Sequence, residues 1–382
     1  MLQLPYSRDD FGINPLMCYF EVTQACDLVC KHCRASAQEN AADDELGTDA
    51  ACRLIEQIAM FPRKPNLVLT GGDPLKRADL FSLIRHAASQ KLSVALTPSA
   101  TPLATLDAFK RAKNAGIQAL GISLDGPDAE VHDAFRGFNG SFEKTCEMLR
   151  FAEDLHLPVQ VNTSITRRNF HLIDEMATFL AERNVSMWSV FFLVPVGRGI
   201  EEERIKPEEY EIAFQKLWNH AGKAPFAIKT TEAPHYRRFV LSQGGDPLQS
   251  PRPFQMGERG KVGDDGQTVP VSPIRHRAPL GVTDGRGIMF ISNNGRIFPA
   301  GFLPLECGRF PNDSVVNIYQ THPVFKALQN PDNYKGICGI CEYRSVCGGS
   351  RARAYAVTGD YLEAEPDCVY KPAVSRPPCP SE

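Results

Sequence analysis

Apolar runs alternate with amphipathic helical segments from Leu16 to about Pro195. Six apolar runs bounded by Gly, Pro, Asn or Asp are predicted to be strands: Leu16–Val22, Asn66–Leu69, Ser93–Thr97, Ala119–Leu124, Pro158–Thr163 and Ser189–Val194. Between them, a helical period predicts helices at Asp49–Phe61, Asp79–Gln90, Leu103–Ala115, Ser141–Leu155 and Leu172–Arg183. This alternation is typical of an α/β fold with a parallel sheet. We predict a partial (β/α)6 TIM-like barrel, and a doubly wound open sheet is the alternative.

The β/α rhythm stops after Ile200. Pro207–Ala221 is predicted to form one more helix, because a proline in the first turn loses no hydrogen bond. Residues 243–279 are rich in Gly, Pro and charge, which predicts a flexible loop, either a lid over substrate or a long surface loop. Gly287–Ser292 and Arg296–Pro299 form a predicted hairpin. We therefore expect a barrel at residues 1–200, a bridging segment at 201–285 and a small C-terminal domain at 286–382.

The composition is that of a globular protein without a strong charge bias. Of the 382 residues, 43% are hydrophobic and 23% are charged, and the formal net charge is −3. Such a charge gives no general attraction to nucleic acid or to an anionic membrane, so neither is expected as a partner. The sequence shows no secretion signal and no stretch long enough to span a membrane, which predicts a cytoplasmic protein. Its twelve cysteines are therefore expected to be reduced thiols or metal ligands.

Three cysteines stand close together directly after the first predicted strand. Cys26, Cys30 and Cys33 have the spacing C-x-x-x-C-x-x-C. Iron–sulfur clusters usually take four cysteine thiolates, so three of them leave one iron open for a small ligand. The alternatives are three unrelated buried thiols or part of a zinc knuckle, although zinc sites usually pair one C-x-x-C with a second.

This motif resembles the signature of the radical SAM enzymes. The resemblance implies a [4Fe–4S] cluster whose open iron binds S-adenosylmethionine (AdoMet). One electron, from a reductant such as flavodoxin or ferredoxin, then splits AdoMet, and the 5′-deoxyadenosyl radical abstracts hydrogen from substrate. Because the cofactors carry this chemistry, we assign no side chain as a catalytic acid or base.

Turns after the later predicted strands resemble the cofactor-binding turns of the same family. Gly71, Gly72, Asp73 and Pro74 follow the second strand and look like the family's G-G-E-P motif, with Asp in place of Glu. Further candidates for AdoMet binding lie at or after the ends of the third to sixth strands: Ser99, Ser123, Asp125, Arg136, Asn162, Thr163 and Val196. Capping is the alternative role for Ser99 and Asp125, and a structural hydrogen bond is the expected role of His132. Since parallel strands of a barrel end at one face, these turns should surround one site.

Four more cysteines lie near the C-terminus: Cys338, Cys341, Cys347 and Cys368. Four thiolates can complete an iron–sulfur cluster or a zinc site. Their spacing resembles the SPASM extension of radical SAM maturases, which normally holds two auxiliary [4Fe–4S] clusters. Ala300 and Arg351 stand where that family carries cysteines, so we expect one auxiliary cluster, with zinc as the alternative metal. Cys307 either serves a degenerate site or, as we expect, is a buried thiol.

The resemblance covers nearly the whole chain and implies a radical SAM enzyme that acts on a bulky substrate. SPASM proteins mostly modify ribosomally made peptides, and a tetrapyrrole-handling branch alters side chains of haem precursors. The basic segment Lys229–Arg238 suits an anionic substrate group, or it is simply a solvated helix start. A non-catalytic iron–sulfur electron carrier or a metal or redox sensor is the alternative function, and it would need no AdoMet pocket.

Overall fold

The centre of the protein is one curved sheet of ten strands. The structure, a computed structural model, describes residues 7–201, 203–247 and 280–373. Strand order in the sheet is β10-β9-β8-β1-β2-β3-β4-β5-β6-β7. Eight strands are parallel: β8 (Ile288–Ile291), β1 (Met17–Glu21), β2 (Asn66–Thr70), β3 (Ser93–Leu96), β4 (Ile117–Ser123), β5 (Val159–Ile165), β6 (Met187–Phe192) and β7 (Ala227–Thr231). Two antiparallel strands, β9 (Arg296–Phe298) and β10 (Gly308–Arg309), extend one edge.

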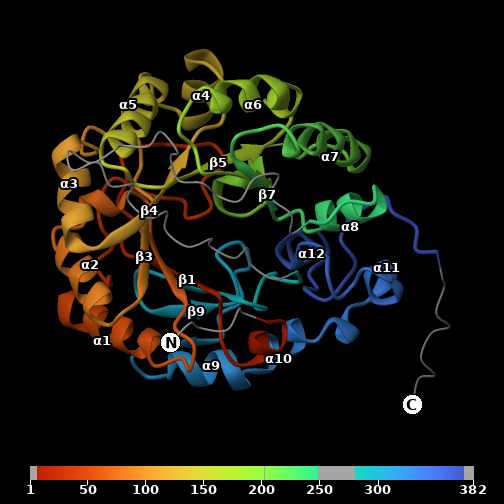
Figure 1. Cartoon of the computed structure of the whole chain (residues 1–382). Helices are drawn as coiled ribbons and strands as arrows, with labels where there is room; N and C mark the ends of the chain where they lie inside the picture. The colour runs from red at the N-terminus through yellow and green to blue at the C-terminus, as the bar shows by residue number, and fades with distance from the viewer. Residues whose placement is uncertain (1–6, 202, 248–279, 374–382) are drawn as a thin grey trace, which may run out of the picture.

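Helices cover the outer side of this sheet. Figure 1 shows an arc formed by α1 (Thr48–Ala59), α2 (Leu80–Ser89), α3 (Leu106–Ala115), α4 (Ala129–Arg136), α5 (Ser141–Asp154), α6 (Ile173–Ala181) and α7 (Pro207–Ala221). Where the arc ends, α8 (His235–Ser242) lies near α11 (Gly336–Ile340) and α12 (Arg351–Thr358). Two further helices, α9 (Val315–Thr321) and α10 (Pro323–Gln329), lie between α8 and α11 in the sequence. Short 3-10 turns are η1 (Asp9–Gly12), η2 (Pro74–Lys76), η3 (Phe170–Leu172), η4 (Gly197–Glu201) and η5 (Pro331–Asn333).

The strand order confirms the predicted partial barrel and excludes the doubly wound alternative. Strands β1 to β7 lie side by side in chain order. A doubly wound sheet reverses its order at a switch point, so its helices cover both faces. Here every crossover runs the same way, and the helices share one core with the outward side chains of the strands, as Phe20 and Leu69 do with Leu54 and Leu83.

The other face of the sheet lines the interior of the barrel. In β5 the buried residues Val159, Val161, Thr163 and Ile165 alternate with partly exposed ones. Successive side chains of a strand point to opposite faces, so Gln160, Asn162 and Ser164 point inward. The interior is therefore polar and open at β5.

The sheet crosses the predicted domain boundaries at residues 200 and 285. β7 pairs with β6, with Ala227 opposite Met187, and its partly polar sequence had not been predicted as a strand. The predicted hairpin is confirmed as β8 and β9, but β8 also pairs in parallel with β1, with Ile288 opposite Met17. The C-terminal region is thus joined to the first strand. Most of the predicted loop at 243–279, namely residues 248–279, lies outside the described residues.

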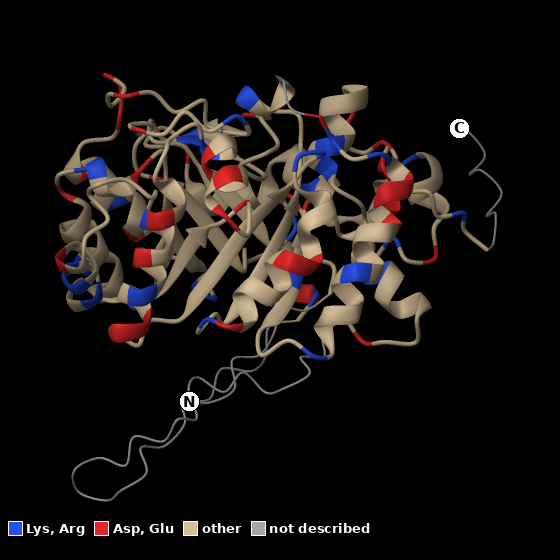
Figure 2. Cartoon of the chain, turned by 90° about the horizontal axis from the view of Figure 1, so that it is seen from above, with Lys and Arg blue, Asp and Glu red and all other residues tan. Residues whose placement is uncertain are grey.

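Charged residues of both signs are intermixed over the helices (Figure 2), in agreement with the small net charge. Among the described residues, none of the helices combines the length and the apolarity that a membrane span requires. None of the cysteines in the described residues forms a disulfide.

Candidate functional site

The first three cysteines lie together in the loop after β1. Cys26, Cys30 and Cys33 pack with Leu28 and Ala37 in one small apolar cluster. The Leu28 N–H donates to Cys26 Sγ at 3.4 Å, and the Ala37 N–H donates to Cys33 Sγ at 3.4 Å. Such N–H···S bonds orient sulfur ligands and stabilise their negative charge. Burial raises the pKa of Cys26 and of Cys30, so binding of a metal there must release protons.

Arg198 holds this loop from the turn after β6. Its Nε donates to the Cys30 carbonyl at 2.9 Å, its Nη1 to the Ala37 carbonyl at 2.8 Å, and its backbone N–H to the Cys33 carbonyl at 3.0 Å. Sequence reasoning missed this role, because an arginine that binds carbonyls leaves no spacing signal. In the same turn, Val196 is partly exposed and packs near Val194.

A substitution at Gly197 should disrupt the loop. Gly197 has φ +56°, and an added Cβ would lie 2.3 Å from the Arg34 carbonyl oxygen and 2.5 Å from that of Cys33. The left-handed conformation costs other residues about 1–2 kcal/mol, and the overlap with backbone adds to this. We expect Gly197→Ala to lose most of the iron bound at this site after anaerobic reconstitution.

The matched control is Gly140→Ala, since Gly140 is also left-handed (φ +87°) but has nothing within 4 Å of an added Cβ. Iron per chain should stay near the wild-type value in the control. Equal iron in both variants would contradict the assigned role of the turn.

The turn after β2 packs directly against the cysteine loop. An added Cβ at Gly71 would lie 2.4 Å from the Thr23 carbonyl oxygen, and one at Gly72 would lie 2.5 Å from that of Ala25. The Gly72 N–H donates to Thr23 O at 2.9 Å, and the Asp73 N–H donates to Ala25 O at 2.6 Å. The two glycines therefore permit a close backbone contact.

The carboxylate of Asp73 ties this turn to the turn after β3. It is fully buried and accepts hydrogen bonds from Thr101 Oγ1 at 2.6 Å, the Leu75 N–H at 3.1 Å and the Ser99 N–H at 3.3 Å. Burial raises its pKa, while these bonds act to lower it. Pro74 begins η2 behind it. The predicted contact of Gly71 to Pro74 with AdoMet stays a prediction.

Ser99 connects Gly72 to the first cysteine. Its Oγ donates to the Gly72 carbonyl at 2.7 Å and lies 3.7 Å from Cys26 Sγ. The residue that caps α3 is Thr105, so the capping alternative for Ser99 does not hold. Ser123, at the end of β4, is partly exposed.

A buried ion pair lies beside the second cysteine. Arg136 Nη2 is 2.6 Å from Asp125 Oδ2, and Arg136 Nη1 is 3.7 Å from Cys30 Sγ. The Ser164 N–H donates to Asp125 Oδ1 at 2.7 Å. Burial acts to raise the pKa of Asp125, but Arg136 and His32 hold it below its usual value. In the structure Arg136 thus pairs with the carboxylate of Asp125. The positive charge of Arg136 favours the thiolate form of Cys30.

His132 has the structural role expected from the sequence. Its Nδ1 accepts from the Asp125 N–H at 3.0 Å, so Nε2 carries the proton and faces Ser141 Oγ at 3.2 Å. Burial lowers the pKa of His132 to about 4, which keeps the ring neutral near pH 7.

The two candidates in β5 occupy opposite faces of the sheet. Thr163 is fully buried, where its Oγ1 donates to the Leu124 carbonyl at 2.6 Å and accepts from Trp188 Nε1 at 2.8 Å. Asn162 is partly exposed on the interior face, where it accepts from Gln160 Nε2 at 2.7 Å. Of the two side chains, only that of Asn162 is open to the barrel interior.

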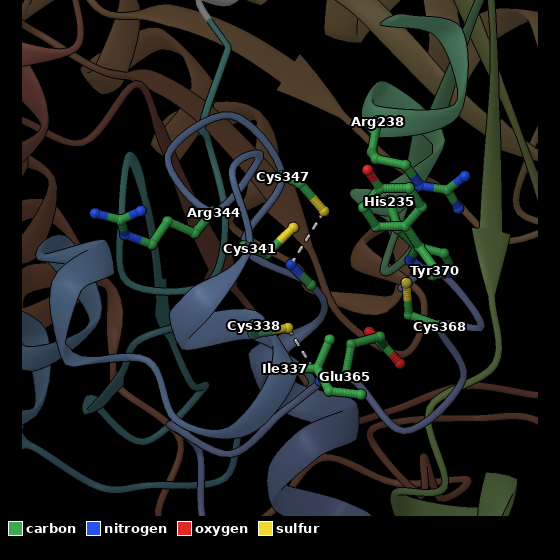
Figure 3. A pocket seen from close by; sticks show the side chains of 12 residues that line it. His235, Arg238, Ile337, Cys338, Cys341, Arg344, Cys347, Glu365, Cys368 and Tyr370 are labelled. Carbon is green, nitrogen blue, oxygen red and sulfur yellow. Dashed lines mark hydrogen bonds between the residues drawn. The ribbon is translucent and has the colours of Figure 1, made fainter. Parts of the chain in front are cut away.

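The four C-terminal cysteines line one pocket, which Figure 3 shows. Cys338 belongs to α11, and Cys341, Cys347 and Cys368 follow in loops. The Glu365 N–H donates to Cys338 Sγ at 3.3 Å, and the Gly349 N–H donates to Cys347 Sγ at 3.4 Å. Sequence analysis had predicted that these sulfurs act together.

The four thiols supply the donor set of an iron–sulfur cluster or of a zinc site. No three His, Cys, Asp or Glu side chains in the described part of the chain converge closely enough to hold a single metal ion. Each iron of a four-iron cluster takes one thiolate, so the ligating sulfurs stand farther apart than around one zinc. Both cysteine sets, with their N–H···S bonds, fit such a cluster. Cys307 instead lies in the core, donates to the Leu305 carbonyl at 3.4 Å, and burial raises its pKa to about 12.

The basic segment that ends at Arg238 does not present its arginines to the barrel. Arg237 donates to the carbonyls of Val346 at 3.2 Å and Val282 at 2.8 Å. Arg238 pairs with Glu211. Arg237 thus joins α8 to the C-terminal region, and Arg238 joins it to α7, so both arginines have partners within the protein. An anionic-substrate site at Lys229–Arg238 stays a prediction.

Comparisons with known proteins agree with this arrangement. Residues 20–180 match the Radical SAM superfamily. The chain is 36% identical to the AdoMet-dependent heme synthase of Methanosarcina barkeri, over 94% of this chain and 97% of that protein. It is 24% identical to the PqqA peptide cyclase of Bradyrhizobium diazoefficiens, over 96% of this chain and 89% of that protein. The crystal structure of Streptococcus suis SuiB bound to S-adenosylmethionine has the same fold, with a TM-score of 0.67 at 14% identity, over 95% of this chain and 79% of that chain.

Proposed function

Because the chain belongs to the radical SAM superfamily, we propose that Cys26, Cys30 and Cys33 hold the family's [4Fe–4S] cluster, with AdoMet beside it. When bound, this pair of cofactors supplies a 5′-deoxyadenosyl radical that takes a hydrogen atom from substrate. The observation that carries the proposal is the position of the three cysteines. They share one apolar cluster after β1, and the turns following β2 and β6 and the helix α4 contact their loop.

The residues of this chain orient the cofactors and exclude water. Leu28 and Ala37 pack beside the sulfurs and keep that side of the site apolar. Arg198 fixes the loop through three carbonyls, and the Asp125–Arg136 pair places a cation at Cys30. A fixed loop keeps all three cysteine sulfurs in position for a cluster that would have one iron open for AdoMet.

The proposed AdoMet contacts divide into two kinds. The partly exposed residues Ser99, Ser123, Asn162 and Val196 can reach a ligand with their side chains. Buried side chains such as Asp73 and Thr163 instead set the positions of the turns. In the turn formed by Gly71 and Gly72, which have no side chains, the backbone N–H and C=O groups would contact the ligand.

We propose that Cys338, Cys341, Cys347 and Cys368 hold one auxiliary [4Fe–4S] cluster in a SPASM-like domain. The supporting observations are one pocket lined by all four residues and amide donors on two of the sulfurs. Ala300 packs with Leu303 in a separate apolar cluster, and Arg351 is a cation, so neither adds a thiolate. A cytoplasmic flavodoxin or ferredoxin is the proposed electron donor.

The proposed substrate is a haem precursor with carboxylate side chains. The identity of 36% to a heme synthase exceeds the 24% to a peptide cyclase, over nearly equal shares of the chain. A ribosomally made peptide is the second candidate, because the peptide cyclase also aligns along nearly the whole chain.

A comparison of two substrates in separate reactions tests this proposal. The anaerobically reconstituted protein is reduced with dithionite and incubated with AdoMet, together with either a propionate-bearing iron porphyrin or a PqqA peptide. We expect 5′-deoxyadenosine in the porphyrin reaction, together with a porphyrin of lower mass by mass spectrometry. A modified peptide with an unchanged porphyrin would contradict the haem-precursor assignment and favour the second candidate.

A further inference from the structure

A buried cation lies against the C-terminal cysteine site. Arg351 begins α12, and its side chain is 0% exposed. Its Nη2 lies 3.7 Å from Cys338 Sγ, and its Nη1 donates to the Glu363 carbonyl at 2.6 Å. The ring of Tyr334 lies 4.6 Å from its guanidinium carbon. The cation is therefore held in one orientation, facing the sulfur.

Arg351 has no carboxylate partner among the residues that the structure describes. Its other contacts are to backbone carbonyls, and no Asp or Glu oxygen lies within 4.0 Å of its guanidinium. Asp284 and Asp360 act on it only from farther away. Asp284 is hydrogen-bonded to Glu232 and to the Ala352 N–H; burial raises its pKa, while these bonds and Arg351 act to lower it. Burying a cation without an adjacent anion is unfavourable. Metal-bound thiolates at the four cysteines would place negative charge directly beside it.

Arg237 approaches the same site from α8. Its two hydrogen bonds go to the carbonyls of Val346 and Val282, and it too has no carboxylate partner in the described ranges. Burial lowers its pKa to about 10, while the thiolate of Cys347 acts in the opposite direction. Two cations near the four sulfurs thus have no carboxylate within ion-pair distance in the described ranges.

The two arginines that line the pocket itself are different. Arg238 pairs with Glu211, and Arg344 pairs with Asp332 at 2.7 Å. Figure 3 shows both side chains extending away from the sulfurs. Of these four arginines, Arg351 is the one with both a contact to a cysteine sulfur and no carboxylate within ion-pair distance in the described part of the chain.

Gly349 leaves the space through which Arg351 reaches the sulfur. An added Cβ there would lie 2.6 Å from Arg351 Nη2 and 3.5 Å from Cys338 Sγ. Any side chain at this position would push the guanidinium away. The close approach of cation and thiolate thus depends on the glycine.

We propose that Arg351 is the counter-charge of the auxiliary cluster and a positioning residue that raises its reduction potential. The proposal rests on the assignment of an auxiliary cluster to the four C-terminal cysteines. Reduction adds one negative charge to a cluster, and a fixed cation next to a ligating sulfur stabilises that charge. The C-terminal cluster is therefore biased toward the reduced state, with Arg237 adding to the effect.

The test is a redox titration followed by electron paramagnetic resonance. The background is the full chain with Cys26→Ala, Cys30→Ala and Cys33→Ala, so that only the C-terminal cluster contributes to the signal. Arg351→Gln removes the charge, Arg351→Lys keeps it, and Arg344→Gln removes a charge that Asp332 already neutralises. Iron and zinc are counted first, and a zinc-only or empty site would sink the auxiliary-cluster assignment itself.

With iron present, we expect Arg351→Gln to lower the equilibrium constant for reduction about tenfold, which is about 59 mV for one electron. Arg351→Lys should stay closer to the parent, and Arg344→Gln should equal it. Equal potentials in the parent and Arg351→Gln, or equal shifts in the Gln and Lys variants, would overturn the proposal. If Arg351→Gln fails to hold the cluster, Arg351→Lys must hold it at the parent's iron content, and its failure to do so would also overturn the proposal.

Discussion

Cys30→Ala is expected to abolish formation of 5′-deoxyadenosine from AdoMet. Cys30 is one of only three thiolates proposed for the first cluster, and it is also the sulfur that faces Arg136. Two thiolates leave two irons without protein ligands, and such a cluster should not persist. Anaerobic reconstitution, reduction with dithionite and chromatography of the nucleoside should give no more product than a sample without protein.

Cys146→Ala is the matched control for this variant. Cys146 is a partly exposed free thiol in α5, and it is not part of either cysteine set. It should keep wild-type activity and iron. Cys30→Ala should still bind iron at the C-terminal site. Wild-type 5′-deoxyadenosine formation in Cys30→Ala would mean that the chemistry lies elsewhere.

Arg353→Met is expected to destabilise the fold by about 3–5 kcal/mol, because removing one partner of a buried ion pair leaves an uncompensated charge. Arg353 is 0% exposed, and its Nε lies 2.9 Å from Glu365 Oε1 and 3.0 Å from Asp367 Oδ2. It also donates to the carbonyls of Leu193, after β6, and of Glu232, after β7. The loss should therefore loosen the C-terminal region from the barrel.

Urea unfolding of the reconstituted protein, followed by circular dichroism, measures this effect. Arg344→Met is the control, because its partner Asp332 is largely exposed. Exposed ion pairs contribute at most about 1 kcal/mol to the free energy of unfolding. Equal midpoints for the two variants would show that Arg353 does not join the two regions.

The sequence predicted the elements whose signals are local. Each of the six predicted strands is present, because each is an apolar run between chain breakers. The two sets of cysteines also come together as their spacing indicated. Membership in the radical SAM superfamily makes the chain an enzyme and removes the alternative of a non-catalytic carrier or sensor.

Features that depend on distant parts of the chain were not predictable in this way. β7 contains Lys229 and two threonines, so it lacks an apolar run, and its partner β6 stabilises it as a strand. The pairing of β8 with β1 joins segments more than two hundred residues apart in the sequence, so no local pattern announces it. The partners of two arginines were not predictable for the same reason. Arg198 binds carbonyls across the fold, and Arg136 finds its carboxylate within the protein.

One measurement tests the central claim most directly, namely that the three-cysteine site leaves an iron open for AdoMet. Reduced protein is mixed with AdoMet labelled with ¹⁵N in its amino group, and electron–nuclear double resonance detects coupling between the label and the cluster. We expect this coupling in the wild-type protein and in a Cys338→Ala variant, and its loss in Cys30→Ala. A wild-type protein that holds its iron at Cys26, Cys30 and Cys33 but shows no coupling to the label would contradict the account.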